Sequence, residues 1–348
     1  MRASRSDQLQ LRVLQNAPVV LLVVVFALFG VLEEKFLRLQ TLEIIVSQSA
    51  ITGILAIGMT FVLLTAGIDL SVGAVMYLGA VIMGRVLDDG SGFVPALLIC
   101  VAIGTLFGLV NAFVITRLRV VAFIVTLATL FIGRGIGVSI SKSEAINFPA
   151  SVSDFASTTV PTPVWDIPLP ILVLAVVAVL AHVTLTRTTF GRQVYAVGND
   201  AEAAEKAGIR TRRILGAVYV ICGACAGLAA VVASAQLGNA SPGFGEQKEF
   251  DAIAAAVLGG TSLFGGRGSV LPGTIIGALL IQTVAVGLVF TGVDIYYLDM
   301  VTALTIFIAV FLDAVRTRKL AGLERRAIRV DLPEAPRAPV PAASRAAT

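Results

Sequence analysis

The sequence predicts an all-α integral membrane protein with about ten membrane-spanning helices and both termini in the cytoplasm. Three observations predict it. Of the 348 residues, 57% are hydrophobic and 14% are charged, whereas soluble domains average about 25% charged residues. Long apolar runs recur along the chain, and the basic residues gather in alternate segments between them. With so little charge, most side chains face lipid or other helices.

The apolar runs set the positions of the expected helices, because a helix needs about 20 residues to cross the hydrocarbon. Two of the runs are short, which predicts broken or short helices near 67–72 and 251–269. The runs that meet or approach the required length are 17–32, 42–66, 72–87, 93–115, 120–140, 168–186, 214–237, 251–264, 270–291 and 295–314.

The basic residues predict the orientation. With about ten spans, the segments rich in arginine and lysine all fall on one side, which the positive-inside rule makes cytoplasmic. The prediction is an N-terminal arm over 1–16, a polytopic membrane domain over 17–315 with a long internal loop over 187–213, and a Pro/Ala-rich, disordered tail over 316–348. On the outer side, prolines in the long loop 141–167 exclude regular helix.

A carboxylate interrupts the apolar pattern in "LLTAGIDLSVGAV", where it lies between two expected spans. A lone charge in the membrane costs roughly 2.5–3.5 kcal/mol on insertion scales. Gly67 loosens the end of one helix, and Asp69 or Ser71 caps the start of the next by accepting backbone N–H groups. Together with Gly73, these residues predict a helix break in the core of the protein.

The loop 187–213 contains "GNDAEAAEKAGI", which reads as a short helix. Asn199 is its expected N-cap, with Glu202 at the third helical position, and Ala203 and Ala204 favour helix. Gly208 is the expected left-handed terminator. Such a helix is either a docking element for a partner or a solvated connection, and the loop taken alone leaves both open.

A second glycine-rich stretch, "GGTSLFGGRGS", predicts a tight cytoplasmic hairpin formed by Gly259, Gly260, Gly265, Gly266, Arg267 and Gly268. It is not a phosphate loop, because the Walker pattern ends in Lys followed by Ser or Thr, and Arg267 is followed by glycine. No other stretch has that pattern, so any ATPase that drives the protein is a separate chain.

Catalysis, metal binding and nucleic-acid binding find no support in the sequence, which predicts a protein that is not an enzyme. There is one histidine, and no nucleophile elbow or metal-ligand motif. The pair in "CGAC", Cys222 and Cys225, has redox spacing, but the small residues around it favour helix packing.

Three stretches together resemble one family. "TAGIDLSVGAV" (65–75), "GRQVYAVGNDAEAAEKAGI" (191–209) and "EFDAIAAAVLGGTSLFGGRGSVLPGTIIGALL" (249–280) look like the membrane permeases of bacterial ABC importers for monosaccharides, within the superfamily of branched-chain amino-acid permeases. The resemblance runs from about residue 40 to 315. The family often has a second glycine after "YAVG", where this chain has Asn199.

The resemblance implies an inner-membrane permease that pairs with itself or with a related chain. Two cytosolic ATPase subunits, which bind ATP and Mg, would drive it, and a periplasmic sugar-binding protein would deliver the substrate. No cofactor is expected in this chain. The residues of the loop expected to rest on the ATPase are Gly198, Asn199, Asp200, Glu202, Ala203, Ala204 and Gly208.

The expected function is ATP-driven import of a monosaccharide or similar polyol by alternating access. The alternative is an ion-coupled carrier that works without an ATPase, although such carriers usually have several intramembrane ionisable groups. For Asp69, the alternative to a helix break is direct contact with sugar. The candidate residues of the substrate path, each of which could instead bond between helices, are Gln48, Thr60, Thr65, Asn111 and Gln282.

Overall fold

The computed structural model describes residues 17–163 and 166–294, and seven positions between 297 and 311. The predictions for the arm 1–16, for most of the run 295–314 and for the tail 316–348 lie outside the described residues.

Helix dominates the described chain, which confirms the all-α class. Only two short antiparallel ribbons interrupt it among the described residues: β1 (Ile146–Asn147) pairs with β4 (Asn239–Ala240), and β2 (Thr159–Val160) with β3 (Ile167–Pro168). The helices are α2 (Ala17–Leu32), η1 (Glu34–Leu37), α3 (Leu39–Leu64), α4 (Val72–Asp88), α5 (Phe93–Arg117), α6 (Ala122–Ser141), α7 (Ala150–Ser157), α8 (Leu169–Arg187), α9 (Thr189–Asn199), α10 (Ala201–Lys206), α11 (Thr211–Leu237), α12 (Lys248–Leu258), η2 (Val270–Thr274) and α13 (Ile275–Phe290).

Six helices of the described chain are long and apolar enough to cross a membrane: α3, α5, α6, α8, α11 and the continuous stretch Val270–Phe290. The protein is therefore a multi-pass membrane protein. Three further predicted spans are shorter helices, namely α2 with 16 residues, α4 with 17 and α12 with 11. The total of about ten crossings, and the side on which each terminus lies, stay predictions.

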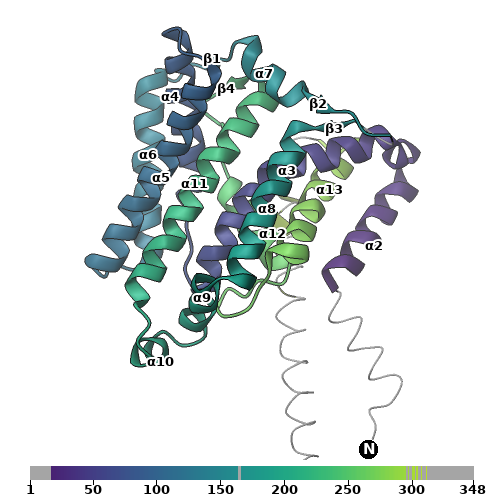
Figure 1. Ribbon diagram of the computed structural model, residues 1–348. Helices are drawn as coiled ribbons and strands as arrows, with labels where there is room; N and C mark the ends of the chain where they lie inside the picture. Colours follow the sequence, from purple (N-terminus) through teal and green to yellow (C-terminus); the bar gives the residue numbers. More distant parts are fainter. Residues whose placement is uncertain are drawn as a thin grey trace, which may run out of the picture.

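Helix α3 forms the centre of the bundle together with α11. In the most apolar 18-residue stretch of each helix, 72% of the residues are buried in α3 and 56% in α11, against 22% in α5. In Figure 1, α4, α5 and α6 lie on one side of α11, and α12, α13 and α2 lie on the other. Small residues let the central helices approach closely: a Cβ on Gly58 of α3 would lie 3.0 Å from Cys222 Cα. The two cysteines thus serve packing, as predicted.

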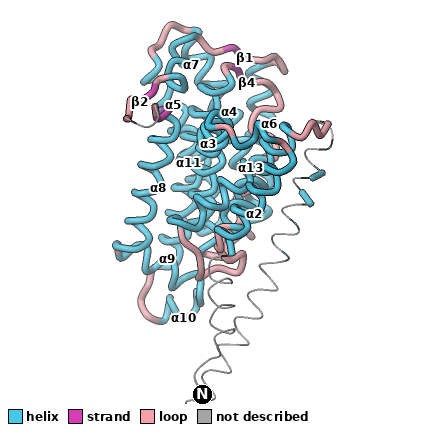
Figure 2. The backbone as a smooth tube through the Cα atoms, turned by 90° about the vertical axis from the view of Figure 1, so that its right-hand side faces the viewer, coloured by secondary structure: helices cyan, strands magenta, loops and turns pink. Residues whose placement is uncertain are grey.

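The two ends of the bundle differ. Helix α7 and the β1–β4 ribbon lie at one end, whereas α9 and α10 lie at the opposite end (Figures 1 and 2). The prediction that prolines exclude helix from the loop 141–167 was wrong, because α7 forms there with Val152 buried. Pro149 is its N-cap, and proline is excluded from a helix interior but tolerated at a helix start, where its missing N–H removes no bond.

Candidate functional site

The predicted break between α3 and α4 is present. Helix α3 ends at Leu64, Ala66 adopts a left-handed conformation with a φ of 58°, and α4 begins at Val72. The carboxylate of Asp69 is 1% exposed. It accepts hydrogen bonds from the backbone N–H of Ser71 at 2.9 Å and from the Ser71 hydroxyl at 2.6 Å. Asp69 therefore stabilises the turn ahead of α4.

Of the two residues predicted as alternatives for capping this break, Asp69 supplies the accepting side chain, whereas the side chain of Ser71, the N-cap residue of α4, makes no capping bond. The Ser71 hydroxyl belongs to a buried network instead. Asn111 Nδ2 donates to Ser71 Oγ at 3.0 Å, and the Thr129 hydroxyl donates to Asn111 Oδ1 at 2.8 Å. This network ties the break to α5 and α6 and gives the polar groups around Asp69 partners within the protein.

Both glycines of the break lie where no larger residue fits. A Cβ on Gly67 would meet the Tyr219 hydroxyl and Val62. A Cβ on Gly73 would meet the carbonyl oxygen of Gly245, in the irregular segment that precedes α12. The starts of the two shortened helices, α4 and α12, therefore lie against each other inside the bundle.

Arg134 of α6 holds the segment before α12 in place. Its Nη1 donates to the carbonyl oxygens of Pro242 at 2.8 Å and of Phe244 at 2.9 Å. Its guanidinium lies 5.1 Å from the centre of the Tyr77 ring, within the range of a cation–π interaction. Arg134 thus links α6 to both α4 and the segment before α12.

At the end of the bundle that carries α9 and α10, three predicted features meet. A Cβ on Gly198, in the last turn of α9, would meet the carbonyl oxygen of Leu64 at the end of α3 and the backbone nitrogen of Gly266 in the glycine hairpin. Gly266 N–H donates to that same Leu64 oxygen at 2.9 Å. The Tyr195 hydroxyl donates to Gly268 O at 2.9 Å. Burial raises the pKa of the Tyr195 phenol, which keeps it protonated and donating.

The hairpin itself spans residues 259–269, between α12 and η2. Gly260, Gly265, Gly266 and Gly268 all have positive φ, from 70° to 154°, a conformation that residues with a Cβ rarely adopt. Phe264 at its tip is 90% exposed. The predicted tight hairpin is therefore present, and its backbone lies against both α9 and α3.

The predicted cap of α10 was wrong by one residue. Asp200 is the N-cap, and its Oδ1 accepts from the backbone N–H of Ala203 at 2.9 Å. Asn199 is the last residue of α9, where its Nδ2 donates to Tyr195 O within the helix. The shift follows from α9, which was not predicted and which continues helical geometry up to Asn199. Gly208, with a φ of 85°, is the predicted left-handed residue after α10.

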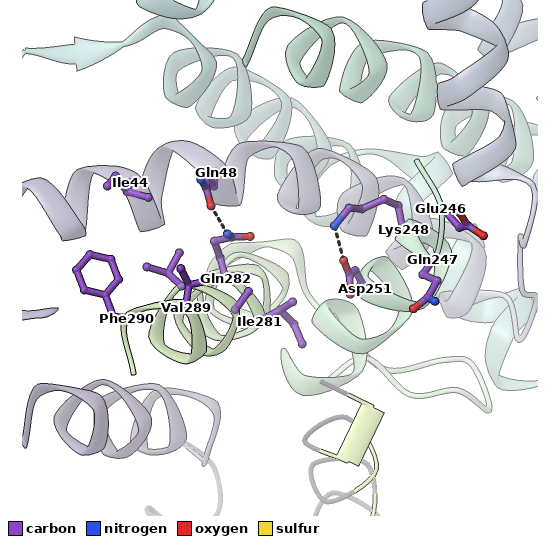
Figure 3. A pocket seen from close by; sticks show the side chains of 12 residues that line it. Ile44, Gln48, Glu246, Gln247, Lys248, Asp251, Ile281, Gln282, Val289 and Phe290 are labelled. Carbon is purple, nitrogen blue, oxygen red and sulfur yellow. Dashed lines mark hydrogen bonds and ion pairs between the residues drawn. The ribbon is translucent and has the colours of Figure 1, made fainter. Parts of the chain in front are cut away.

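A cavity opens between α3, α12 and α13 (Figure 3). It has a volume of about 570 Å³, and a neighbouring cavity of about 760 Å³ shares Ile44, Gln48, Lys248 and Gln282 with it. Gln282 Nε2 of α13 donates to Gln48 Oε1 of α3. Lys248 Nζ bonds Asp251 Oδ2 at 2.7 Å within the first turn of α12. Gln48, Gln282 and Lys248 thus line both cavities, whereas Asp251 lines only the first.

In the first cavity, Glu246 and Gln247 add further polar groups beside the ion pair, and the wall formed by α13 is largely apolar. Ile281, Val286, Val289 and Phe290 of α13 line it together with Ile44 of α3. In Figure 3 the glutamine pair lies between Ile44, Val289 and Phe290 on one side and the ion pair of α12 on the other. A ligand in the cavity would therefore meet carboxamides and charges on one side and hydrocarbon on the other.

Of the five predicted path residues, the structure brings Gln48 and Gln282 together and leaves the others buried elsewhere. The Thr60 hydroxyl lies 2.8 Å from the Thr274 hydroxyl, and Thr65 donates to Val62 O at 2.9 Å. Asn111 belongs to the network around the break. These three already have partners within the protein, and their role in a substrate path stays a prediction.

Sequence reasoning missed Lys248 as a lining residue, because Lys248 lies before the expected span 251–264. The available signal was the Lys248–Asp251 spacing of three, which places both side chains on one helix face. Among the residues that the structure describes, no group of three or more His, Cys, Asp or Glu side chains is placed to hold a metal ion.

Comparison with known proteins places the chain in a family. Residues 41–310 match the family described as the permease component of the branched-chain amino acid transport system. The chain is 34% identical over 302 residues to a ribose import permease of Escherichia coli, covering 86% of this chain and 94% of the relative. It is 38% identical over 304 residues to a fructose import permease of Rhizobium meliloti, covering 85% and 84%.

A third relative is a D-allose transport system permease of Escherichia coli, 36% identical over 296 residues, which cover 84% of this chain and 89% of the relative. No solved structure matches the chain. The family match and these identities establish that the chain belongs to the family of branched-chain amino acid transport system permease components.

Proposed function

We propose that this chain is the membrane-spanning subunit of an ATP-driven importer that moves a monosaccharide or similar polyol into the cytoplasm. The family membership supports the importer, and relatives named for ribose, fructose and allose support the substrate class. The observation in the structure that carries the proposal is the cavity between α3, α12 and α13. Carboxamides both donate to and accept from hydroxyl groups, and aliphatic side chains pack on the C–H faces of a sugar ring.

In this proposal the end that carries α9 and α10 faces the cytoplasm, in agreement with the excess of arginine and lysine in the loops assigned to it. A cytosolic ATPase rests on α10, whose exposed side includes Glu202 and Ala203. The partners are two such ATPases, which bind ATP and Mg, a second permease subunit, and a periplasmic sugar-binding protein.

The contact between α9, the hairpin and α3 supplies a path for coupling. Gly198 leaves no space between α9 and the carbonyl oxygen of Leu64, so a displacement of α10 and α9 presses directly on the last turn of α3. That turn leads into the irregular segment 65–71, whose backbone absorbs rotation more readily than a helix. ATP-driven movement of the docked α10 would in this way reach the break and α4.

The test is uptake of labelled pentoses and hexoses into proteoliposomes that contain the chain, its partner permease if required, and the ATPase. The expected result is uptake that requires ATP and the delivering binding protein. Uptake driven by an ion gradient without ATPase would overturn the proposal in favour of a secondary carrier.

The cavity is tested in the same assay by Gln48→Ala and Gln282→Ala. Each change removes groups worth about 1 kcal/mol per hydrogen bond, so a several-fold loss of uptake is expected. Gln40→Ala is the matched control, since Gln40 is an exposed glutamine on the same helix and lines neither cavity. Equal uptake by all three variants would show that substrate does not use this cavity.

A further inference from the structure

A third cavity, of about 480 Å³, lies at the end of the bundle that carries α10, and its wall is strongly basic. Arg117, the last residue of α5, lines it together with Arg210, Arg212 and Arg213 at the start of α11. Glu205 is the one carboxylate in the wall. All four arginines are exposed, and the ion pairs found within the described residues involve none of them.

The cavity lies where two membrane-spanning helices end. Helices α5 and α11 pack closely, since a Cβ on Gly104 would meet the carbonyl oxygen of Gly223. Much of α5 is not covered by other helices of the described chain: Phe113 is 59% exposed, and Leu118, directly after Arg117, is 61% exposed. The arginines therefore surround a hollow that lies beside an exposed apolar surface, where two membrane-spanning helices end.

The charges in the wall select for an anion. Four guanidinium groups around one hollow repel each other, and one glutamate offsets only a fraction of that charge. Each guanidinium presents its N–H groups in a planar fork that binds two oxygens of a phosphate at once. An anionic group in the cavity would relieve the repulsion and supply the acceptors that these donors lack within the described chain.

We propose that this cavity binds the phosphate of an anionic phospholipid headgroup from the cytoplasmic leaflet. The inference uses the orientation proposed above but not the identity of the transported solute. Of the anions available, a lipid is the one whose acyl chains would continue along the exposed apolar face formed by Phe113 and Leu118. An acidic surface of the ATPase is the competing occupant. The exposed apolar side chains of Phe113 and Leu118 favour the lipid over this competitor.

The experiment measures lipid retention on the purified full-length protein by native mass spectrometry in detergent. Cardiolipin, phosphatidylglycerol and phosphatidylcholine are titrated separately. A basic residue near an anionic lipid is worth about 1 kcal/mol, or roughly five-fold in affinity. We expect Arg117→Gln and Arg213→Gln each to weaken binding of the two anionic lipids about five-fold, and the double variant about 30-fold, with phosphatidylcholine unaffected.

Arg119→Gln is the matched control. Arg119 carries the same charge two residues from Arg117, is exposed, and does not line the cavity, so less than a two-fold change is expected. Arg213→Lys keeps the charge without the fork, and an intermediate loss is expected. If a glutamine variant of the cavity fails to fold, Arg213→Lys still tests the site.

Three results would overturn the proposal. Equal loss in Arg119→Gln and in the cavity variants would show unspecific attraction to a basic surface. Full displacement of the lipid by millimolar inorganic phosphate would show a site for free anions. Unchanged lipid binding together with loss of the co-purified ATPase from the double variant would show that the surface docks the ATPase. None of these results depends on uptake, so failure of the proposed transport function remains distinguishable.

Discussion

Gly198 is a position where helix propensity and packing predict opposite effects of a substitution to alanine. It lies within the last turn of α9, where replacing glycine by alanine favours a helix by about 0.5–1 kcal/mol. The new methyl group, however, would meet the carbonyl oxygen of Leu64 and would lie 2.7 Å from the backbone nitrogen of Gly266. Both are backbone atoms, which cannot rotate away as a side chain can.

The contact should outweigh the helix propensity. Overpacking costs about 1–3 kcal/mol, and separating Gly266 from Leu64 removes a hydrogen bond worth about 1 kcal/mol. Gly198→Ala is therefore expected to lower the stability by about 1–3 kcal/mol net and to reduce ATP-driven uptake, because α9 no longer seats against the end of α3. Thermal unfolding of the purified protein at one fixed scan rate, followed by uptake in proteoliposomes, measures both effects.

Gly216→Ala is the control for this prediction. Gly216 lies inside α11, and its added Cβ would lie 3.7 Å from the Cβ of Ala112, an ordinary contact. This variant should be stabilised slightly and should transport normally. If Gly198→Ala also unfolds at a higher temperature than the parent protein, α9 does not press on Leu64 and the proposed coupling contact is wrong.

Two further predictions concern Asp69 and Arg134. Asp69→Asn should transport nearly as well as the parent, because an amide oxygen can accept both bonds from Ser71. Asp69→Ala should lower the free energy of unfolding by about 2–4 kcal/mol, measured by thermal unfolding. Loss of uptake by a folded Asn variant would show that the charge itself is required. Arg134→Gln should lower the free energy of unfolding by about 2–5 kcal/mol and reduce uptake, since two charge-assisted bonds hold the segment ahead of Lys248. The control is Arg85→Gln, at an exposed arginine, which should lower it by less than about 1 kcal/mol. Equal unfolding of the two variants would refute the role of Arg134.

Features that depend on a few neighbouring residues could be predicted from the sequence. The break around Asp69, the glycine hairpin and the left-handed Gly208 each follow from local backbone preferences, and the structure has all three. The cap of α10 was placed one residue early because α9, a short amphipathic helix that directly precedes it, was not anticipated. Helix α7 was missed because proline was taken to exclude helix from a whole loop rather than from the helix interior.

The cavity could not be predicted, because the residues that form it are far apart in the chain. Gln48 and Gln282 are 234 positions apart, and one sequence gives no means of pairing them. Both were nevertheless candidates, since a carboxamide in an apolar helix needs a partner. Thr60, Thr65 and Asn111 satisfied the same criterion with partners inside the protein, so the criterion finds buried hydrogen bonds and does not separate binding residues from packing residues.

On the proposed substrate path, the bond between Gln48 and Gln282 would affect the speed of transport. A solute that crossed from one cavity to the other would have to separate the two carboxamides, and each of them would then exchange an amide partner for a sugar hydroxyl. A hydrogen bond contributes only about 1 kcal/mol net, and the hydroxyls would return most of it, so the crossing would have a low barrier and would leave no deep binding minimum. Such a subunit would release its cargo readily, and selection among sugars would rest with the protein that delivers them.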